Sequence, residues 1–237
     1  EPDETMNNRS IRYPRGKTLG GSSSINGLLW IRGQSEDYNI WRQLGNTGWG
    51  WNDVLPYFLK SENNELGKGE FHNDNGPITV ANKKINLKLL DEFQNAAEEY
   101  GIPKTNDFNT GDNTGVGFFQ FTTSFNKPGL KLRCSAAKGY LNPVKKRSNL
   151  KIVVKAHVQK INFEGKKAIG ASYYNGNKIV EVKANKEIIL SAGAIGSPHI
   201  LQVSGIGNKK KLKKLGIDIV HESNGVGLNL QDHLMFR

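Results

Sequence analysis

The sequence predicts an α/β fold, and the first reason is a strand, a glycine turn and a helix late in the chain. The apolar run 187–192 has the length and composition of a buried strand, and residues 193–196 form a glycine-containing turn. Ser197 is a suitable helix cap, Pro198 suits the first helical position, and Gly205 suits the end of the helix. Such a unit allows a ligand to approach the end of the strand.

The second reason is a series of short strands immediately before this unit. The pairs Glu164-Gly165 and Asn175-Gly176 are typical of tight hairpin turns. We therefore expect a meander of antiparallel strands, which the apolar pattern places at 151–155, 158–163, 168–174 and 178–183.

The first half of the chain predicts a mixture of helices and strands. Apolar spacing and end signals predict helices at 35–44, 52–61 and 86–100, and strands at 77–80 and 117–124. We expect one apolar stripe on the third helix to pack against a sheet; it consists of Leu87, Leu90, Phe93, Ala97 and Tyr100.

Composition and charge narrow the classes of protein. Hydrophobic residues make up 36% of the 237 residues, and no apolar run is long enough to span a bilayer. The one cysteine, Cys134, excludes an internal disulfide and a multi-cysteine zinc site, and we expect no metal and a buried thiol. The net charge is +11, with basic runs at 145–147 and 209–214. No nucleic-acid motif accompanies these lysines, so we interpret them as solvated surface and expect no nucleic-acid partner.

The most informative pattern is the glycine- and serine-rich stretch 15–27. Gly20 and Gly21 precede three serines, and backbone without side chains allows a ligand to lie close. Serine hydroxyls and backbone N–H groups at the start of a helix suit an anion such as a pyrophosphate. Taken alone, the stretch is equally well explained as a surface turn.

Three segments together resemble the signature motifs of the glucose–methanol–choline (GMC) family of flavin oxidoreductases. Residues 20–26 (Gly-Gly-Ser-Ser-Ser-Ile-Asn) are similar to the first motif, and residues 191–207 to the second. Residues 225–233 (Gly-Val-Gly-Leu-Asn-Leu-Gln-Asp-His) are similar to a segment that follows in the family. The resemblance covers essentially the whole chain and is nearest to the bacterial alcohol and choline dehydrogenase branch.

The resemblance implies a partial FAD-binding Rossmann-like domain with a β-meander, plus part of an α+β substrate-binding domain. We expect the FAD-binding domain at 1–62 and 149–237 and the substrate-binding domain at 63–148. The family's N-terminal glycine fingerprint and its catalytic histidine region have no counterpart here, so we expect an internal part of a longer enzyme. We assign no catalytic residue, and we expect His72 and His221 to be exposed.

The resemblance also implies the reaction and its partners. An alcohol CH–OH group is oxidised, hydride passes to FAD, and electrons pass to a quinone or similar acceptor. We expect a cytoplasmic bacterial protein, with peripheral membrane contact left open. The alternatives are a lyase of the same family, in which flavin is structural, and a non-catalytic basic binding module.

The site residues implied by the resemblance bind the cofactor, and two departures from the family bear on its chemistry. Some relatives attach FAD through a histidine at the position of Ile25, so we predict dissociable FAD. Choline-specific relatives carry a glutamate at the position of Met235, so we expect neutral alcohols rather than choline. The implied cofactor-binding residues are Thr18, Gly20, Gly21, Ser22, Asn26, Gly27, Leu28, Leu29, Val158, Ala192, Gly193, Asp232 and His233.

Overall fold

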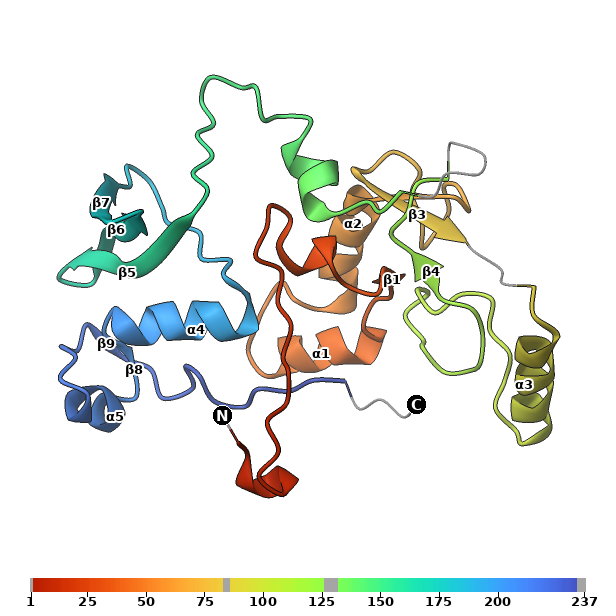
Figure 1. Cartoon of the computed structure of the whole chain (residues 1–237). Coiled ribbons are helices and arrows are strands. Elements are labelled where there is room, and N and C mark those ends of the chain that lie inside the picture. Colours follow the sequence, from red (N-terminus) through yellow and green to blue (C-terminus); the bar gives the residue numbers. More distant parts are fainter. Residues whose placement is uncertain (1, 83–85, 126–131, 234–237) are drawn as a thin grey trace. The chain divides into compact units, whose positions relative to one another are not determined.

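The computed structural model describes residues 2–82, 86–125 and 132–233, and the chain forms two compact units (Figure 1). Unit 1 is Glu1–Leu150 and unit 2 is Lys151–Arg237. The predicted separation of 1–62 from 63–148 as different domains stays a prediction. Within the described ranges, no helix has the length and apolar character needed to cross a bilayer.

Unit 1 contains a mixed four-stranded sheet. Its order is β1 (Leu29–Trp30), β4 (Gln120–Phe121), β3 (Ile78–Asn82) and β2 (Glu62–Asn64). β4 is antiparallel to both of its neighbours, whereas β2 and β3 are parallel. Because two of these pairings are antiparallel and one is parallel, the sheet is a mixed one.

The core of unit 1 is small, and polar groups lie beside it. Ile78, Val80 and Cys134 form a buried cluster, and Trp30 packs against it. The thiol of Cys134 accepts a hydrogen bond from the Thr79 N–H at 3.4 Å, which confirms the predicted burial of this cysteine and gives it a structural role.

The predicted strand 117–124 is too long, because β4 contains two residues only. The preceding segment pairs elsewhere: the Thr105 N–H donates to Val116 O, and the Val116 N–H donates to Pro103 O, each at 2.9 Å. Backbone groups committed to that contact are not available to continue the sheet.

Two of the predicted helices of unit 1 are confirmed and pack on each other. They are α1 (Ser35–Gln43) and α2 (Trp51–Ser61). Asp37 and Asp53 each accept a hydrogen bond from the backbone N–H three residues earlier, which fixes where the helices begin. Shorter helical turns are η1 (Glu4–Met6), η2 (Gly21–Ser24) and η3 (Ala137–Leu141).

The third predicted helix is present as α3 (Lys88–Glu99), but its apolar stripe does not pack against a sheet. Of its residues, Leu87 is 51% exposed, Phe93 is 65% exposed and Tyr100 is 87% exposed. Amphipathic spacing shows which face of a helix is apolar, whereas what covers that face depends on its neighbours. In the described part of the chain, the expectation of core packing is therefore wrong.

Unit 2 begins with the predicted meander. The strands β5 (Ala156–Glu164), β6 (Lys167–Asn175) and β7 (Lys178–Lys183) form an antiparallel sheet in that order. Glu164 pairs with Lys167 and Asn175 pairs with Lys178, so both predicted hairpins are confirmed. The predicted strand 151–155 is wrong, because that segment has no pairing partner within the described ranges and adopts no regular structure.

The strand predicted at 187–192 is also wrong. The segment has no regular structure, and Ile189 is 80% exposed. A strand exists through hydrogen bonds to a neighbouring strand, and none pairs with this segment in the described residues. The helix that follows, α4 (Gly193–Val203), begins four residues earlier than Ser197, and Pro198 lies inside it. The Ser197 hydroxyl instead accepts a hydrogen bond from the Ala192 N–H at 2.9 Å.

The last elements of unit 2 form a small parallel βαβ arrangement. β8 (Ile206–Gly207) and β9 (His221–Glu222) are parallel and are joined through α5 (Lys209–Lys214). Leu212 is 1% exposed, whereas the lysines of α5 are exposed. The basic run 209–214 is therefore the solvated face of a helix anchored by one leucine, as predicted.

Candidate cofactor-binding site

The glycine- and serine-rich stretch of unit 1 is a tight loop that folds back on itself. Gly16 packs directly against the backbone of Gly21 and Ser22, so a side chain has no room there. Gly20 (φ +90°) and Gly21 (φ +55°) adopt left-handed backbone conformations that favour glycine. The Gly21 N–H donates to Thr18 O at 2.9 Å and closes the turn.

The serines of this loop have mainly structural roles. The Ser23 hydroxyl donates to Gly20 O at 2.5 Å, and the Ser24 hydroxyl donates to Leu19 O at 2.9 Å. Ser22 is exposed, and its hydroxyl oxygen accepts a hydrogen bond from the Gly16 N–H at 3.2 Å. The hydroxyls of Ser23 and Ser24 are therefore bonded within the loop, whereas Ser22, the serine of the predicted cofactor-binding set, is exposed.

Arg133 holds the loop from more than a hundred residues further along the chain. One guanidinium nitrogen, Nη1, donates to Asn26 Oδ1 at 2.6 Å and to Ser23 O at 3.2 Å. The other, Nη2, donates to Asn26 O at 2.8 Å. The planar guanidinium thus holds both the side-chain carboxamide and the backbone carbonyl of Asn26, which fixes the carboxamide relative to the backbone. Sequence reasoning did not find this role of Arg133, because nothing local connects the two segments.

Leu28 has a strained backbone at the point where the loop meets the sheet. Its φ is +71°, which is costly for a residue with a side chain. The Leu28 carbonyl accepts hydrogen bonds from the Thr122 N–H at 2.8 Å and the Thr122 hydroxyl at 3.1 Å. Strain that is held in place by its surroundings is typical of functional sites.

Several predicted contact positions have open space beside the backbone. A Cβ at Gly21, Gly27 or Gly193 would have no other atom within 4 Å, whereas one at Gly16 would collide with the loop. The open space at Gly21, Gly27 and Gly193 leaves room for a group outside the chain, whereas the fold itself requires a glycine at position 16. The residues present thus fit a cofactor that approaches the backbone closely.

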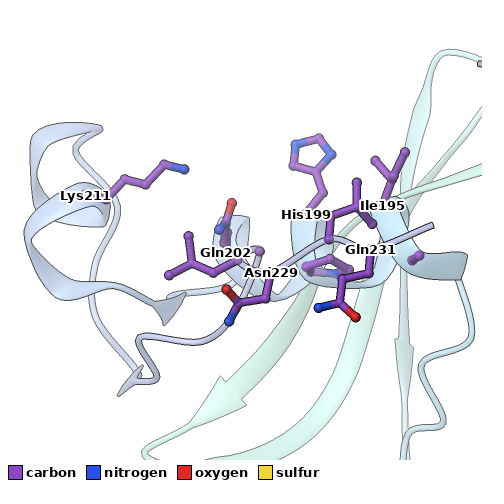
Figure 2. Close-up of a pocket in the computed structure, with 11 residues that line it drawn as sticks. Ile195, His199, Gln202, Lys211, Asn229 and Gln231 are labelled. Carbon is purple, nitrogen blue, oxygen red and sulfur yellow. The ribbon is translucent and has the colours of Figure 1, made fainter. Parts of the chain in front are cut away.

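Unit 2 carries a cavity of about 550 Å³ between α4 and the segment 227–231 (Figure 2). Ile195 and His199 come from α4, and Asn229 and Gln231 come from the segment beside it. The Gln202 side chain donates to Val226 O at 3.0 Å and ties that segment to the helix. The wall therefore combines apolar surface with amide and imidazole groups, as ligand cavities commonly do.

Val158 lies on β5 beside an irregularity in the strand pairing. The register shifts between Val158 and Lys160, which marks a β-bulge. Bulges redirect backbone groups and occur often next to binding sites. The family resemblance implies that backbone groups of Val158 meet the adenine of the cofactor, and this geometry is compatible with that role.

The structure places the predicted residues in two groups. Those of unit 1 lie on one continuous segment of the chain, which ends at Leu29 on β1. Those of unit 2 lie at three places: on β5, at and just before the start of α4, and after the segment that lines the cavity. The first group is Thr18, Gly20, Gly21, Ser22, Asn26, Gly27, Leu28 and Leu29, and the second is Val158, Ala192, Gly193, Asp232 and His233. Their role in cofactor binding stays a prediction. Met235 lies outside the described residues.

The predicted exposure of His72 is wrong, whereas His221 is exposed as expected. His72 is 8% exposed; its Nδ1 contacts Glu62 Oε1 at 2.9 Å and its Nε2 contacts Asp107 Oδ2 at 2.7 Å. Burial by itself lowers the pKa of an imidazole, but hydrogen bonds to Asp107 and Glu62 and the attraction of both charges raise the pKa of His72 to about 9. With both ring nitrogens bonded, His72 is not available as a catalytic base.

In the described ranges, no group of three or more histidine, cysteine or acidic side chains could hold a metal ion.

Comparison with known proteins defines the class. Residues 4–235 match the GMC oxidoreductase family, and the chain therefore belongs to it. The chain is 41% identical over 236 residues to the oxygen-dependent choline dehydrogenase of Rhizobium meliloti (strain 1021), and the match covers 100% of this chain and 42% of that protein.

Solved structures show the same relationship. The FAD-dependent oxidoreductase from Chaetomium thermophilum is similar with a TM-score of 0.90 and 37% identity, covering 98% of this chain and 42% of that one. Pyridoxine 4-oxidase from Mesorbium loti is similar with a TM-score of 0.82 and 29% identity, covering 91% of this chain and 42% of that one. The chain thus spans less than half the length of each of these proteins.

Proposed function

We propose that this chain is part of an FAD-dependent oxidoreductase that oxidises the CH–OH group of an alcohol to a carbonyl. The observation that carries the proposal is the loop that ends at Leu29, in which Gly21 and Gly27 leave open space and Arg133 orients Asn26. The names of the relatives, which include a choline dehydrogenase and a pyridoxine oxidase, support alcohols as the substrate class.

The chain's own residues provide binding and orientation. When bound, FAD supplies the two-electron acceptor for hydride from the alcohol carbon. Gly21 and Gly27 allow backbone groups to lie near the cofactor, and the Asn26 carboxamide is directed by its bonds to Arg133. Leu28 and Leu29 supply apolar surface at the end of the loop. No residue of this chain is assigned as the base that takes the hydroxyl proton.

We further propose that the FAD is dissociable. Ile25 is exposed on the loop and carries no nucleophilic atom, so it cannot form a bond to a flavin ring. Acid precipitation of the full-length enzyme should leave the flavin in solution. Flavin that remains on the precipitated protein would contradict the assignment.

Two further features bear on the identity of the alcohol and of the electron acceptor. Met235 in place of a carboxylate favours a neutral alcohol over choline, because a trimethylammonium group gains no ion pair there. We propose a quinone-like acceptor, although the name of the R. meliloti relative gives oxygen that role in that protein.

The direct test is product formation by the full-length enzyme with added FAD. We expect a carbonyl product from neutral alcohols, a higher kcat/KM for them than for choline, and faster turnover with a quinone than with oxygen. A product formed by elimination without an electron acceptor would instead identify the lyase alternative. Salt-dependent binding to DNA or anionic vesicles without flavin uptake would identify the basic binding module.

A further inference from the structure

Four charged side chains that contact one another in series lie next to β1, the strand at the end of the predicted cofactor loop. Arg32 and Glu62 form an ion pair at 2.9 Å, with side chains 2% and 0% exposed. His72 continues the chain of contacts from Glu62 to Asp107. With His72 protonated, two cations and two anions balance, which is the arrangement that makes buried charge tolerable.

Trp30, at the end of β1, and Arg32, two residues further along the chain, both bind the Glu62 carboxylate. The Trp30 Nε1–H donates to Glu62 Oε2 at 3.0 Å, and Arg32 pairs with Glu62 Oε1. The Arg32 backbone N–H donates to Asn109 Oδ1 at 2.8 Å, and its guanidinium Nη1 donates to Phe71 O at 2.8 Å. Glu62 therefore binds the strand at two positions, 30 and 32, that share one face of an extended chain.

The alternate positions, Leu29 and Ile31, lie on the opposite face and are 47% and 41% exposed. In an extended chain a displacement by one residue would exchange the two faces. Fixing Trp30 and Arg32 below the strand therefore determines that Leu29 points away from the charges. The family resemblance implies that the segment 26–29 lines the flavin ring. Leu29 is its last residue, and Leu28 before it is already held in a strained conformation.

We propose that Glu62 and His72 are positioning residues that set the orientation of the flavin-lining segment 26–29 through Trp30 and Arg32. The inference rests on the proposed function for its ligand and extends it to a second layer of residues. Glu62 acts on the strand directly. His72 acts through Glu62, because its Nδ1 and the Asn73 N–H both bind Glu62 Oε1 and fix the carboxylate.

The test uses the full-length enzyme with saturating FAD and two variants. Glu62→Gln removes the charge that joins Arg32 and His72. Trp30→Phe keeps the aromatic ring and all four charges but removes the hydrogen bond at 3.0 Å. Glu98→Gln is the matched control, because it removes a carboxylate from the exposed Lys104 pair of the same unit.

We expect both variants to bind FAD but to show faster amide hydrogen exchange over residues 28–32 and an altered visible circular dichroism of the flavin. We expect kcat to fall by about 10- to 100-fold, as for other misplacements of order 1 Å, with a smaller change in KM. Glu98→Gln should match the unmodified enzyme. If Glu62→Gln does not fold, the same measurements on Trp30→Phe test the proposal.

The inference is overturned if Trp30→Phe and any folded Glu62→Gln protein lose only thermal stability and keep the exchange pattern, flavin spectrum and kcat of the unmodified enzyme. A different result contradicts the proposed function: an unmodified enzyme that takes up no flavin, or whose flavin no alcohol reduces. The two failures are distinguished because the second is seen before any variant is made.

Discussion

Single side chains determine the geometry of the predicted cofactor loop, and Arg133 is the clearest case. Its guanidinium makes hydrogen bonds to Asn26 and Ser23, with one distance as short as 2.6 Å. A lysine has one nitrogen and cannot reproduce this planar pattern. The sequence contains Asn26 and Arg133 but gives no local sign that they meet, so the contact could be found only from the folded chain.

We predict that Arg133→Lys weakens FAD binding by the full-length enzyme about tenfold, equivalent to about 1.4 kcal/mol. The physical reason is that Asn26 loses part of the pair of donors that orients it. Flavin fluorescence titration measures the dissociation constant. Arg147→Lys, in an exposed turn, is the control; equal affinities for both variants would show that Arg133 does not organise the cofactor loop.

The buried imidazole of His72 predicts a dependence of stability on pH. Its pKa is raised from 6.5 to about 9 in the folded chain, so its contribution is complete below about pH 6.5 and is lost as the pH rises through about 9. At most about 3 kcal/mol is involved, and less to the extent that solvent screens the charges. At the acid end, the pKa values of Glu62 and Asp107 are lowered by their bonds to His72 despite burial, so their contribution is lost as the pH falls.

Denaturant unfolding of the 237-residue chain at a series of pH values tests this. The four tryptophans at positions 30, 41, 49 and 51 all lie in unit 1, so their fluorescence reports the unit that holds His72. His72→Gln should remove most of the alkaline loss of stability, and the exposed His221→Gln should not. An alkaline slope that persists in His72→Gln would contradict the assigned protonation.

At the scale of elements, local patterns predicted those structures whose causes are local. Apolar spacing and end signals predicted α1, α2 and α3, and the pairs Glu164-Gly165 and Asn175-Gly176 predicted the hairpins of β5, β6 and β7. The strands predicted at 151–155 and 187–192 failed because a strand depends on a partner that an apolar run does not reveal. The prediction that the apolar stripe of α3 packs against a sheet failed for a similar reason, because apolar spacing does not reveal what covers the stripe.

The helix α5 allows a test of how a strongly basic element is stabilised. Leu212, 1% exposed, anchors it, while Lys213 is exposed. We predict that Leu212→Ala lowers the free energy of unfolding by about 2 to 5 kcal/mol, because a buried leucine leaves a cavity. Lys213→Ala should change it by less than about 0.5 kcal/mol. Thermal unfolding followed by circular dichroism compares the two; equal effects would contradict the role of Leu212 as the residue that anchors the helix.

At the scale of the whole molecule, the chain is two compact units, and each carries part of the predicted set of cofactor residues. The sequence identified the family because short motifs at 20–26, 191–207 and 225–233 keep their order along the chain. It did not predict the buried set of Arg32, Glu62, His72 and Asp107, since these residues are separated in sequence and none of them looks unusual alone. Of these four, His72 was expected at the surface, and packing places it inside.

We propose that the complete enzyme removes hydride from an alcohol carbon. Anaerobic mixing of the FAD-loaded full-length enzyme with single alcohols, followed by flavin absorbance, tests this step. We expect bleaching of the flavin by at least one neutral alcohol, with one carbonyl formed for each flavin reduced. Flavin that stays oxidised with every neutral alcohol and with choline, in an enzyme shown to bind FAD, would contradict it.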